Sequence, residues 1–149
     1  KNNVAERSGD TMKFTRRNTM LMAFGTAAAA MLPARAMASV EEIIATFTGG
    51  AAVGDAGLTL TAPEIAENGN TVPIEVSAPG AVSIMVLATG NPTPGAATFN
   101  FGPLAGSQAA STRIRLAKTQ DVMAIAKMAD GSFVQVTQEV KVTIGGCGG

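Results

Sequence analysis

The only cysteine of the chain, Cys147, lies near its carboxyl end between two pairs of glycines: Gly145 and Gly146, then Gly148 and Gly149. Glycine has no Cβ and adopts conformations closed to other residues, and chain ends are ordered only where something fastens them. This spacing predicts a thiol on a short swinging arm that can enter the pocket of another protein. The alternative interpretation is a frayed, glycine-rich tail with an incidental cysteine.

Few other side chains could carry out catalysis. The sequence has no histidine, so Ser/His and Cys/His pairs are excluded, and a zinc site would need several Cys or His ligands. No haem-attachment motif or phosphate-binding loop is present. An ordinary thiol, with a pKa of about 8.5, is mostly protonated at neutral pH. We therefore expect a non-catalytic protein without metal or cofactor, whose thiol is a substrate activated by a docking enzyme.

Two further pairs of charged residues are candidate sites. Glu64 and Glu67 lie in a turn-like segment and could form a carboxylate pair, although acids in loops are usually only solvated. Arg113 and Arg115 are expected on one face of a strand, where they could bind an anion or protect a sheet edge. Neither pair is assigned a function.

The chain begins with the features of an export leader. Arg16-Arg17 precede a 13-residue apolar run, Met20 to Leu32, and Ala36-Met37-Ala38 resembles a signal-peptidase site. The run is too short to span about 30 Å of hydrocarbon, and the paired arginines indicate the twin-arginine pathway. We expect a signal peptide over 1–38 and a periplasmic protein.

An N-terminal membrane anchor and an ordinary amphipathic helix are the alternatives for this leader. The first eleven residues are expected to be an artefactual extension, because Met12 would be a natural start. Residues 39–149 carry nine acidic and five basic side chains. That acidic balance argues against nucleic acid or an anionic membrane as a partner. A single cysteine in an exported protein indicates intermolecular pairing or a reactive thiol.

The carrier domain is expected over 39–144. Ser39 and Glu42 have the spacing of a capping box and predict a short helix over about 40–48, ended by Gly49-Gly50. Its apolar residues, Ile43, Ile44 and Phe47, should pack on the body of the domain or on a partner.

Apolar residues then alternate with polar ones at the period of a strand, and Gly, Pro, Asn and Asp separate the runs. About seven strands at this spacing predict an all-β, immunoglobulin-like antiparallel sandwich. Asp130-Gly131 predicts a hairpin. The second strand of this hairpin keeps its valines on one face if a bulge is allowed near Gln138, and it runs directly into Gly145. The five residues 145–149, fully extended, reach roughly 16–18 Å. The strands are expected around Leu58–Leu60, Val72–Val76, Ala81–Leu87, Thr98–Phe101, Arg113–Leu116, Val122–Lys127 and Phe133–Ile144.

The mature part of the chain resembles the SoxY family, the sulfur-carrier subunits of periplasmic thiosulfate-oxidising (Sox) systems. The resemblance rests above all on the carboxy-terminal signature, and it extends over nearly all of residues 39–149. The matching segments are Pro63–Gly69, Val72-Pro73, Asn91-Pro92, Thr112–Ala117, Asp130-Gly131 and Val140–Gly149. Asn18-Thr19 follow the arginine pair where a hydrophobic pair is usual.

The resemblance implies a heterodimer with a second small β-sandwich subunit, SoxZ, which would be exported together with this chain. It implies that a c-type haem enzyme joins thiosulfate oxidatively to Cys147, and that a dimanganese hydrolase then removes sulfate and leaves a persulfide. The glycines would give the arm a cross-section thin enough for narrow channels.

Two other functions fit parts of the sequence. Ubiquitin-like sulfur carriers also end in Gly-Gly and load sulfur as a C-terminal thiocarboxylate, but they use ATP in the cytosol. An exported structural or adhesive β-sandwich could instead dimerise through Cys147.

Overall fold

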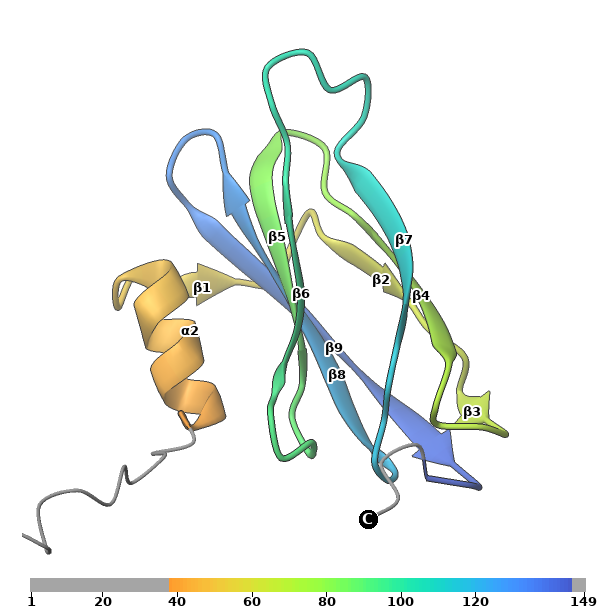
Figure 1. Cartoon of the computed structure of the whole chain (residues 1–149). Coiled ribbons are helices and arrows are strands. Elements are labelled where there is room, and N and C mark those ends of the chain that lie inside the picture. Colours follow the sequence, from red (N-terminus) through yellow and green to blue (C-terminus); the bar gives the residue numbers. More distant parts are fainter. Residues whose placement is uncertain (1–37, 146–149) are drawn as a thin grey trace, which may run out of the picture. The chain divides into compact units, whose positions relative to one another are not determined.

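Nine strands and one helix form the regular structure of residues 38–145, the part of the chain that the structure, a computed structural model, describes (Figure 1). The expected signal peptide over 1–38 therefore lies outside the described residues except for Ala38. The elements are α2 (Val40–Thr48), β1 (Val53–Gly54), β2 (Thr59–Thr61), β3 (Ile65–Ala66), β4 (Val72–Ser77), β5 (Ala81–Ala88), β6 (Gly95–Asn100), β7 (Ala109–Ile114), β8 (Gln120–Met128) and β9 (Phe133–Val142).

The strands form two sheets, as the sequence predicts. The larger sheet has the order β1-β9-β8-β5-β6, and β3 also pairs with β9; the smaller sheet has the order β2-β4-β7. The longer strands are antiparallel, but β1 and β3 run parallel to β9, which differs from the purely antiparallel expectation. These two strands have two residues each, too few to display a period of two.

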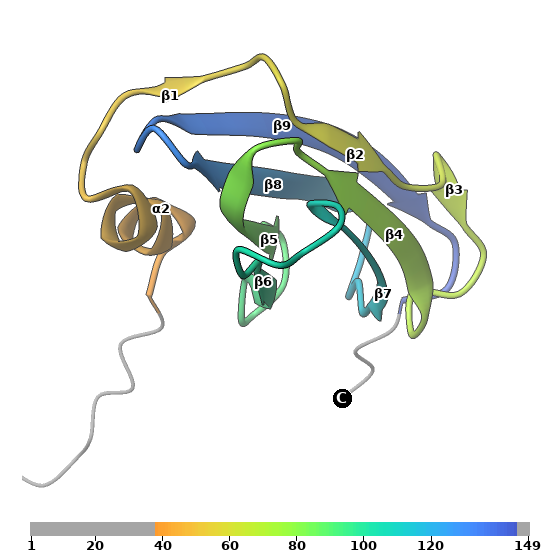
Figure 2. The same cartoon turned by 90° about the horizontal axis from the view of Figure 1, so that it is seen from above.

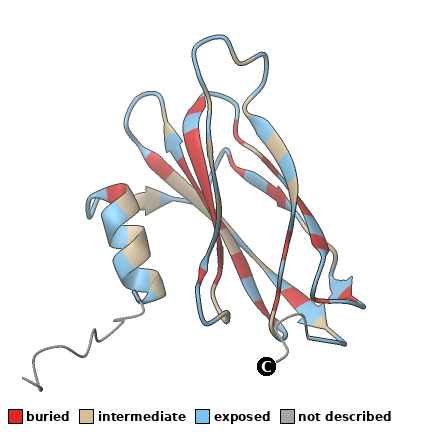
Figure 3. Cartoon of the chain, in the orientation of Figure 1, coloured by how far each residue is buried: buried red, intermediate tan, exposed pale blue. Residues whose placement is uncertain are grey.

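The main hydrophobic core lies between the two sheets. Valine, isoleucine and leucine side chains from both sheets fill it, including Val72, Val76, Ile84, Val86, Leu116, Val122 and Val140. A second cluster lies on the other face of the larger sheet, where Met85, Leu87, Ile125 and Phe133 meet the helix. Figure 2 shows α2 and the smaller sheet on opposite sides of β5. Strand β5 is therefore buried on both faces and reads as a nearly continuous apolar run (Figure 3).

The predicted helix is present with its predicted ends. The N–H of Ser39 donates to Glu42 Oε2 at 2.9 Å, and the N–H of Glu42 donates to Ser39 Oγ at 3.2 Å, which completes the capping box. Gly49 ends the helix with a φ of 65°, in the left-handed region that favours glycine. The rings of Phe47 and Phe133 meet edge to face, with centroids 5.9 Å apart, so the helix packs on the sheet of its own chain.

The β8–β9 hairpin turns at Asp130-Gly131 as predicted, and Gly131 has a φ of 86°. The carboxylate of Asp130 accepts hydrogen bonds from the hydroxyl and the N–H of Ser132, which lower the pKa of Asp130. The prediction of a bulge near Gln138 is wrong. The pairing of β8 with β9 keeps one register from the pair Lys127–Phe133 to the pair Gln120–Val140. Gln138 lies among the valines instead, and its Nε2 donates to the carbonyl oxygen of Ala62 at 2.8 Å.

Candidate functional site

The last described residues, Thr143 to Gly145, form the base from which the glycine-flanked cysteine segment continues. Strand β9 ends at Val142, and hydrogen bonds fix the chain beyond it. The N–H of Thr143 donates to the carbonyl of Ala66 at 3.1 Å, and the N–H of Gly69 donates to the carbonyl of Ile144 at 2.8 Å. The backbone is thus held through Ile144, two residues beyond the strand.

The segment that holds this base from one side is Glu64 to Gly69. Its short strand β3 pairs in parallel with the end of β9, and the carbonyl of Glu64 accepts from the N–H of Lys141 at 2.9 Å. The carbonyl of Glu67 accepts from the hydroxyl of Thr143 at 2.9 Å. Both carboxylates are exposed. The two glutamates weighed as a carboxylate pair therefore contact the base through backbone carbonyls, which sequence reasoning did not anticipate.

The loop between β7 and β8 holds the base from the other side. The hydroxyl of Thr119 accepts from the N–H of Val142 at 3.0 Å. A Cβ added to Gly145 would collide with the carbonyl oxygen of Ala117, so the close backbone approach at this position requires glycine. Gly145 was predicted as part of the arm; this contact gives it a packing role, and its part in a swinging arm stays a prediction.

A polar network fixes the β7–β8 loop in turn. The Oδ1 of Asn91 accepts from the N–H of Ala117 at 2.9 Å and from Nε2 of Gln120 at 2.8 Å, while its Nδ2 donates to the carbonyl of Arg115 at 2.7 Å. Gln120 is buried, and its Oε1 accepts from the N–H of Gly90 at 2.8 Å. The turn at Asn91-Pro92, which follows β5, therefore holds the loop that contacts the base of the arm. The sequence did not indicate this role.

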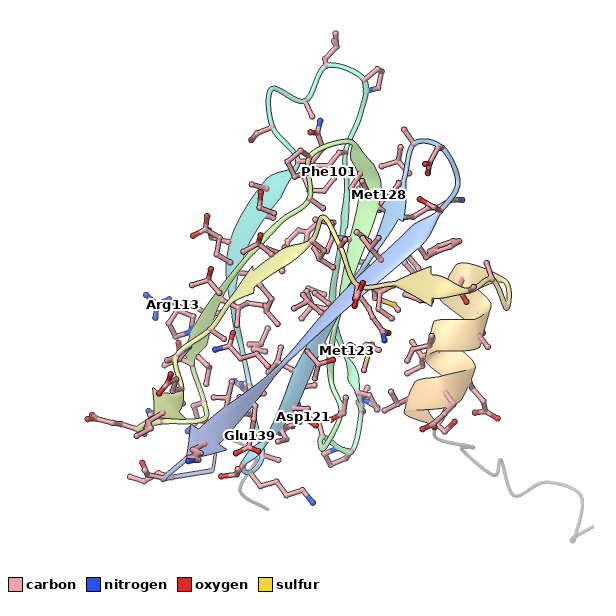
Figure 4. All side chains as sticks on the ribbon, turned by 180° about the vertical axis from the view of Figure 1, so that it is seen from behind. Phe101, Arg113, Asp121, Met123, Met128 and Glu139 are labelled. Carbon is pink, nitrogen blue, oxygen red and sulfur yellow. The ribbon has the colours of Figure 1, made fainter. Side chains whose placement is uncertain are left out.

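Charged residues of both signs lie on the strands β8 and β9 and on the loop that contacts the base. Arg115 and Lys118 belong to the loop that Gly145 contacts, so these cations lie closer to the base than their sequence separation from it indicates. Asp121 and Glu139 are cross-strand partners on β8 and β9, and Figure 4 labels both exposed acids. Like charges directly opposite each other weaken a strand pair slightly.

The two candidate anion-binding arginines are both exposed, but only Arg113 belongs to a strand. Strand β7 ends at Ile114, so Arg115 lies in the following loop, where its carbonyl accepts from Nδ2 of Asn91. Arg113 is exposed on β7, an edge strand of the smaller sheet, and points away from the sandwich in Figure 4. That placement favours the edge-protection interpretation for Arg113.

The predicted site residues Gly146, Cys147, Gly148 and Gly149 lie outside the described residues. Within 38–145, no group of three or more His, Cys, Asp or Glu side chains could hold a metal ion. No helix in this part of the chain has the length and apolar character needed to cross a membrane. Two of the large hydrophobic side chains exposed here, Ile65 at 59% and Ile144 at 67%, belong to the base and the segment that holds it.

Comparison with solved structures identifies the fold more closely. The sulfur carrier protein SoxY from Chlorobium limicola f. thiosulfatophilum is 33% identical, with a TM-score of 0.62, over 71% of this chain and 97% of that one. Superoxide reductase (neelaredoxin) from Ignicoccus hospitalis matches at 18% identity and a TM-score of 0.51, over 57% of this chain and 79% of that one, and shares the fold alone. No curated protein matches the chain in sequence.

The family profile described as sulfur oxidation protein SoxY matches residues 44–147, which include the second half of the helix, both sheets and the cysteine. This match covers more than half of the chain and agrees with the structural similarity to SoxY of Chlorobium limicola. The chain belongs to the SoxY family of sulfur oxidation proteins.

Proposed function

We propose that this chain is a covalent carrier of sulfur intermediates in thiosulfate oxidation, which holds them on the thiol of Cys147 and presents them to partner enzymes. Family membership supports a carrier role in sulfur oxidation. The observation that carries the proposal is the base of the arm: hydrogen bonds fix the backbone through Ile144, and Cys147 follows three residues later.

The loading step is an oxidative S–S bond formation. The thiol loses its proton and joins the terminal sulfur of thiosulfate to give a cysteine S-thiosulfonate, and two electrons pass to a c-type haem enzyme. Water then cleaves the bond between the sulfur and the sulfonate on a dimanganese hydrolase. Sulfate leaves, and a persulfide remains on Cys147. The chain itself supplies no catalytic group in this scheme and needs no metal or cofactor of its own.

The geometry of the base limits how a partner enzyme can reach the thiol. Cys147 is the second residue after Gly145, so the backbone between them extends by at most about 7 Å. A catalyst must therefore receive the base as well as the arm. Ile65 and Ile144 supply exposed apolar surface there, and Lys118 supplies a charge. We further propose that the carrier works as a heterodimer with a SoxZ-type subunit in the periplasm, after export by the twin-arginine pathway.

A reconstituted assay tests the carrier function. The full chain, its partner subunit, the haem enzyme and the hydrolase are mixed with thiosulfate, and haem reduction is followed with time. Cys147→Ser should abolish turnover, while Leu104→Ser, a change at a loop residue that is 97% exposed, should leave it intact. Turnover that survives Cys147→Ser would favour a structural protein that dimerises through this cysteine. Sulfur that loads on Cys147→Ala would favour the thiocarboxylate carrier.

A further inference from the structure

A groove separate from the arm lies between α2 and the larger sheet. Its volume is about 740 Å³, and strands β5, β6 and β8 line it opposite the helix. Small-molecule sites typically measure about 300–1,000 Å³. None of the lining residues belongs to the base of the arm or to the segments that hold it. The carrier function therefore leaves this groove unexplained.

A β-bulge shapes the sheet side of the groove. In the β5–β8 ladder, Ala81 pairs with Met128 and Ser83 pairs with Lys127, so Val82 is the extra residue. Successive residues of a regular strand point to opposite faces. Here both Val82 and Ser83 line the groove, because the bulge redirects one of them.

Three polar side chains cross the groove in one row. Ser83 on β5 pairs with Lys127 on β8 and with Asn100 on β6, and all three line the groove. Neighbouring strands lie about 4.8 Å apart, so the backbones of these three residues follow one another at about that spacing. Ser83 is only 8% exposed, and its hydroxyl has no hydrogen-bond partner among the described residues. Buried hydroxyls are normally paired, so this one marks a place for a missing acceptor.

The rest of the groove is mainly apolar. Ile43 and Phe47 of the helix face Met85 on the sheet, and Val82, 39% exposed, adds to the same lining. One acid, Glu42, also lines the groove on the helix side, where its Oε2 accepts the N–H of Ser39 in the capping box. On the sheet side, the three polar side chains of the row can each donate a hydrogen bond and lie next to an apolar surface.

We propose that this groove binds a small amphiphilic carboxylate. Lys127 and Asn100 donate to the carboxylate together with the hydroxyl of Ser83, and the hydrocarbon part packs against Ile43, Phe47 and Met85. A carboxylate fits because it accepts several hydrogen bonds at once and is attracted by the single lysine of the lining.

Octanoate is the probe, titrated into the ¹⁵N-labelled full chain and followed by amide chemical shifts. Saturable shifts at Ser83 and Asn100 are expected, and octylamine, with the same chain length and the opposite charge, should not produce them. Lys127→Gln should weaken octanoate about tenfold, which is the typical effect of losing one charge-assisted hydrogen bond. Ser83→Ala should weaken it by a smaller factor.

Lys118→Gln is the matched control, since it removes the same charge from an exposed loop outside the groove. It should leave octanoate binding unchanged. The proposal is overturned if the groove amides do not shift, if octylamine binds as well as octanoate, or if Lys118→Gln and Lys127→Gln weaken binding equally. None of these outcomes bears on the thiol chemistry of Cys147.

Discussion

Gly145 links the fixed base to the segment that carries the thiol, and replacing it with alanine tests that link. A Cβ at this position would collide with the carbonyl oxygen of Ala117, and a backbone atom cannot rotate away as a side-chain end can. The least costly way to remove this collision is for Ile144 and Gly145 to move away from the segments that hold the base. That movement breaks the hydrogen bond from the buried N–H of Gly69 to the carbonyl of Ile144.

The cost follows from that one contact. A net hydrogen bond contributes about 1 kcal/mol, and a buried donor left unpaired costs about 1–3 kcal/mol. The expected loss for Gly145→Ala is therefore about 1–3 kcal/mol of unfolding free energy. At roughly 4 °C per kcal/mol for a domain near this size, the Tm should fall by about 4–12 °C.

Thermal unfolding followed by circular dichroism measures this shift, and hydrogen exchange at Gly69 locates it. Gly106→Ala is the matched control, because a Cβ there meets nothing within 4 Å. It should leave the Tm unchanged or raise it, since alanine restricts the unfolded chain. If Gly145→Ala behaves like Gly106→Ala and Gly69 stays protected, the fixed-base reasoning is refuted.

Three further substitutions test separate parts of the account. Asn91→Ala should destabilise the fold by about 2–4 kcal/mol in denaturant titration, because it removes the three hydrogen bonds that Asn91 makes with Arg115, Ala117 and the buried Gln120. Ser83→Ala should stabilise the fold by about 1 kcal/mol in the same titration, since it removes a buried hydroxyl that has no hydrogen-bond partner within residues 38–145; a loss of stability would contradict this. Ser132→Ala should raise the pKa of Asp130 toward the ordinary value of 3.8, measured by NMR of the carboxyl carbon. Because the folded state lowers that pKa, the stabilisation by Asp130 is present above the unfolded pKa and disappears as the pH falls through the folded one; an unchanged titration would refute the assignment.

Local sequence signals predicted much of the fold. The capping box at Ser39 and the Asp130-Gly131 turn are determined by residues that are neighbours in the sequence. The helix and the hairpin therefore lie where they were expected. Alternating apolar residues identified the longer strands, because one buried face imposes a period of two. The apolar run of β5 was also recognised, although its burial on both faces depends on the helix that packs there.

The departures have long-range causes. Gln138 interrupts an apolar face and suggested a bulge, but its amide finds the carbonyl of Ala62, 76 residues away in the chain. The strands β1 and β3 are fixed by β9, and neither has enough residues to show a pattern. Such contacts depend on the tertiary arrangement rather than on local propensity.

At the candidate site, too, the sequence predicted the local feature but not the long-range contacts. Cys147 is conspicuous in the sequence because it is the only cysteine and has glycine on both sides. The frame that holds its base uses backbone carbonyls of Glu64, Ala66 and Glu67, and every residue type has such a carbonyl. Side-chain patterns therefore pointed to the carboxylates, although the structure uses the backbone next to them.

The most direct test of the carrier function is the intact mass of the full chain after incubation with thiosulfate and the oxidising haem partner. We expect a gain of about 112 Da for one thiosulfonate, which disappears with a reductant, and a gain of about 32 Da after the hydrolase has removed sulfate. Neither gain should occur with Cys147→Ser. A gain that persists in this variant, or that peptide mapping assigns to another residue, would contradict the central claim.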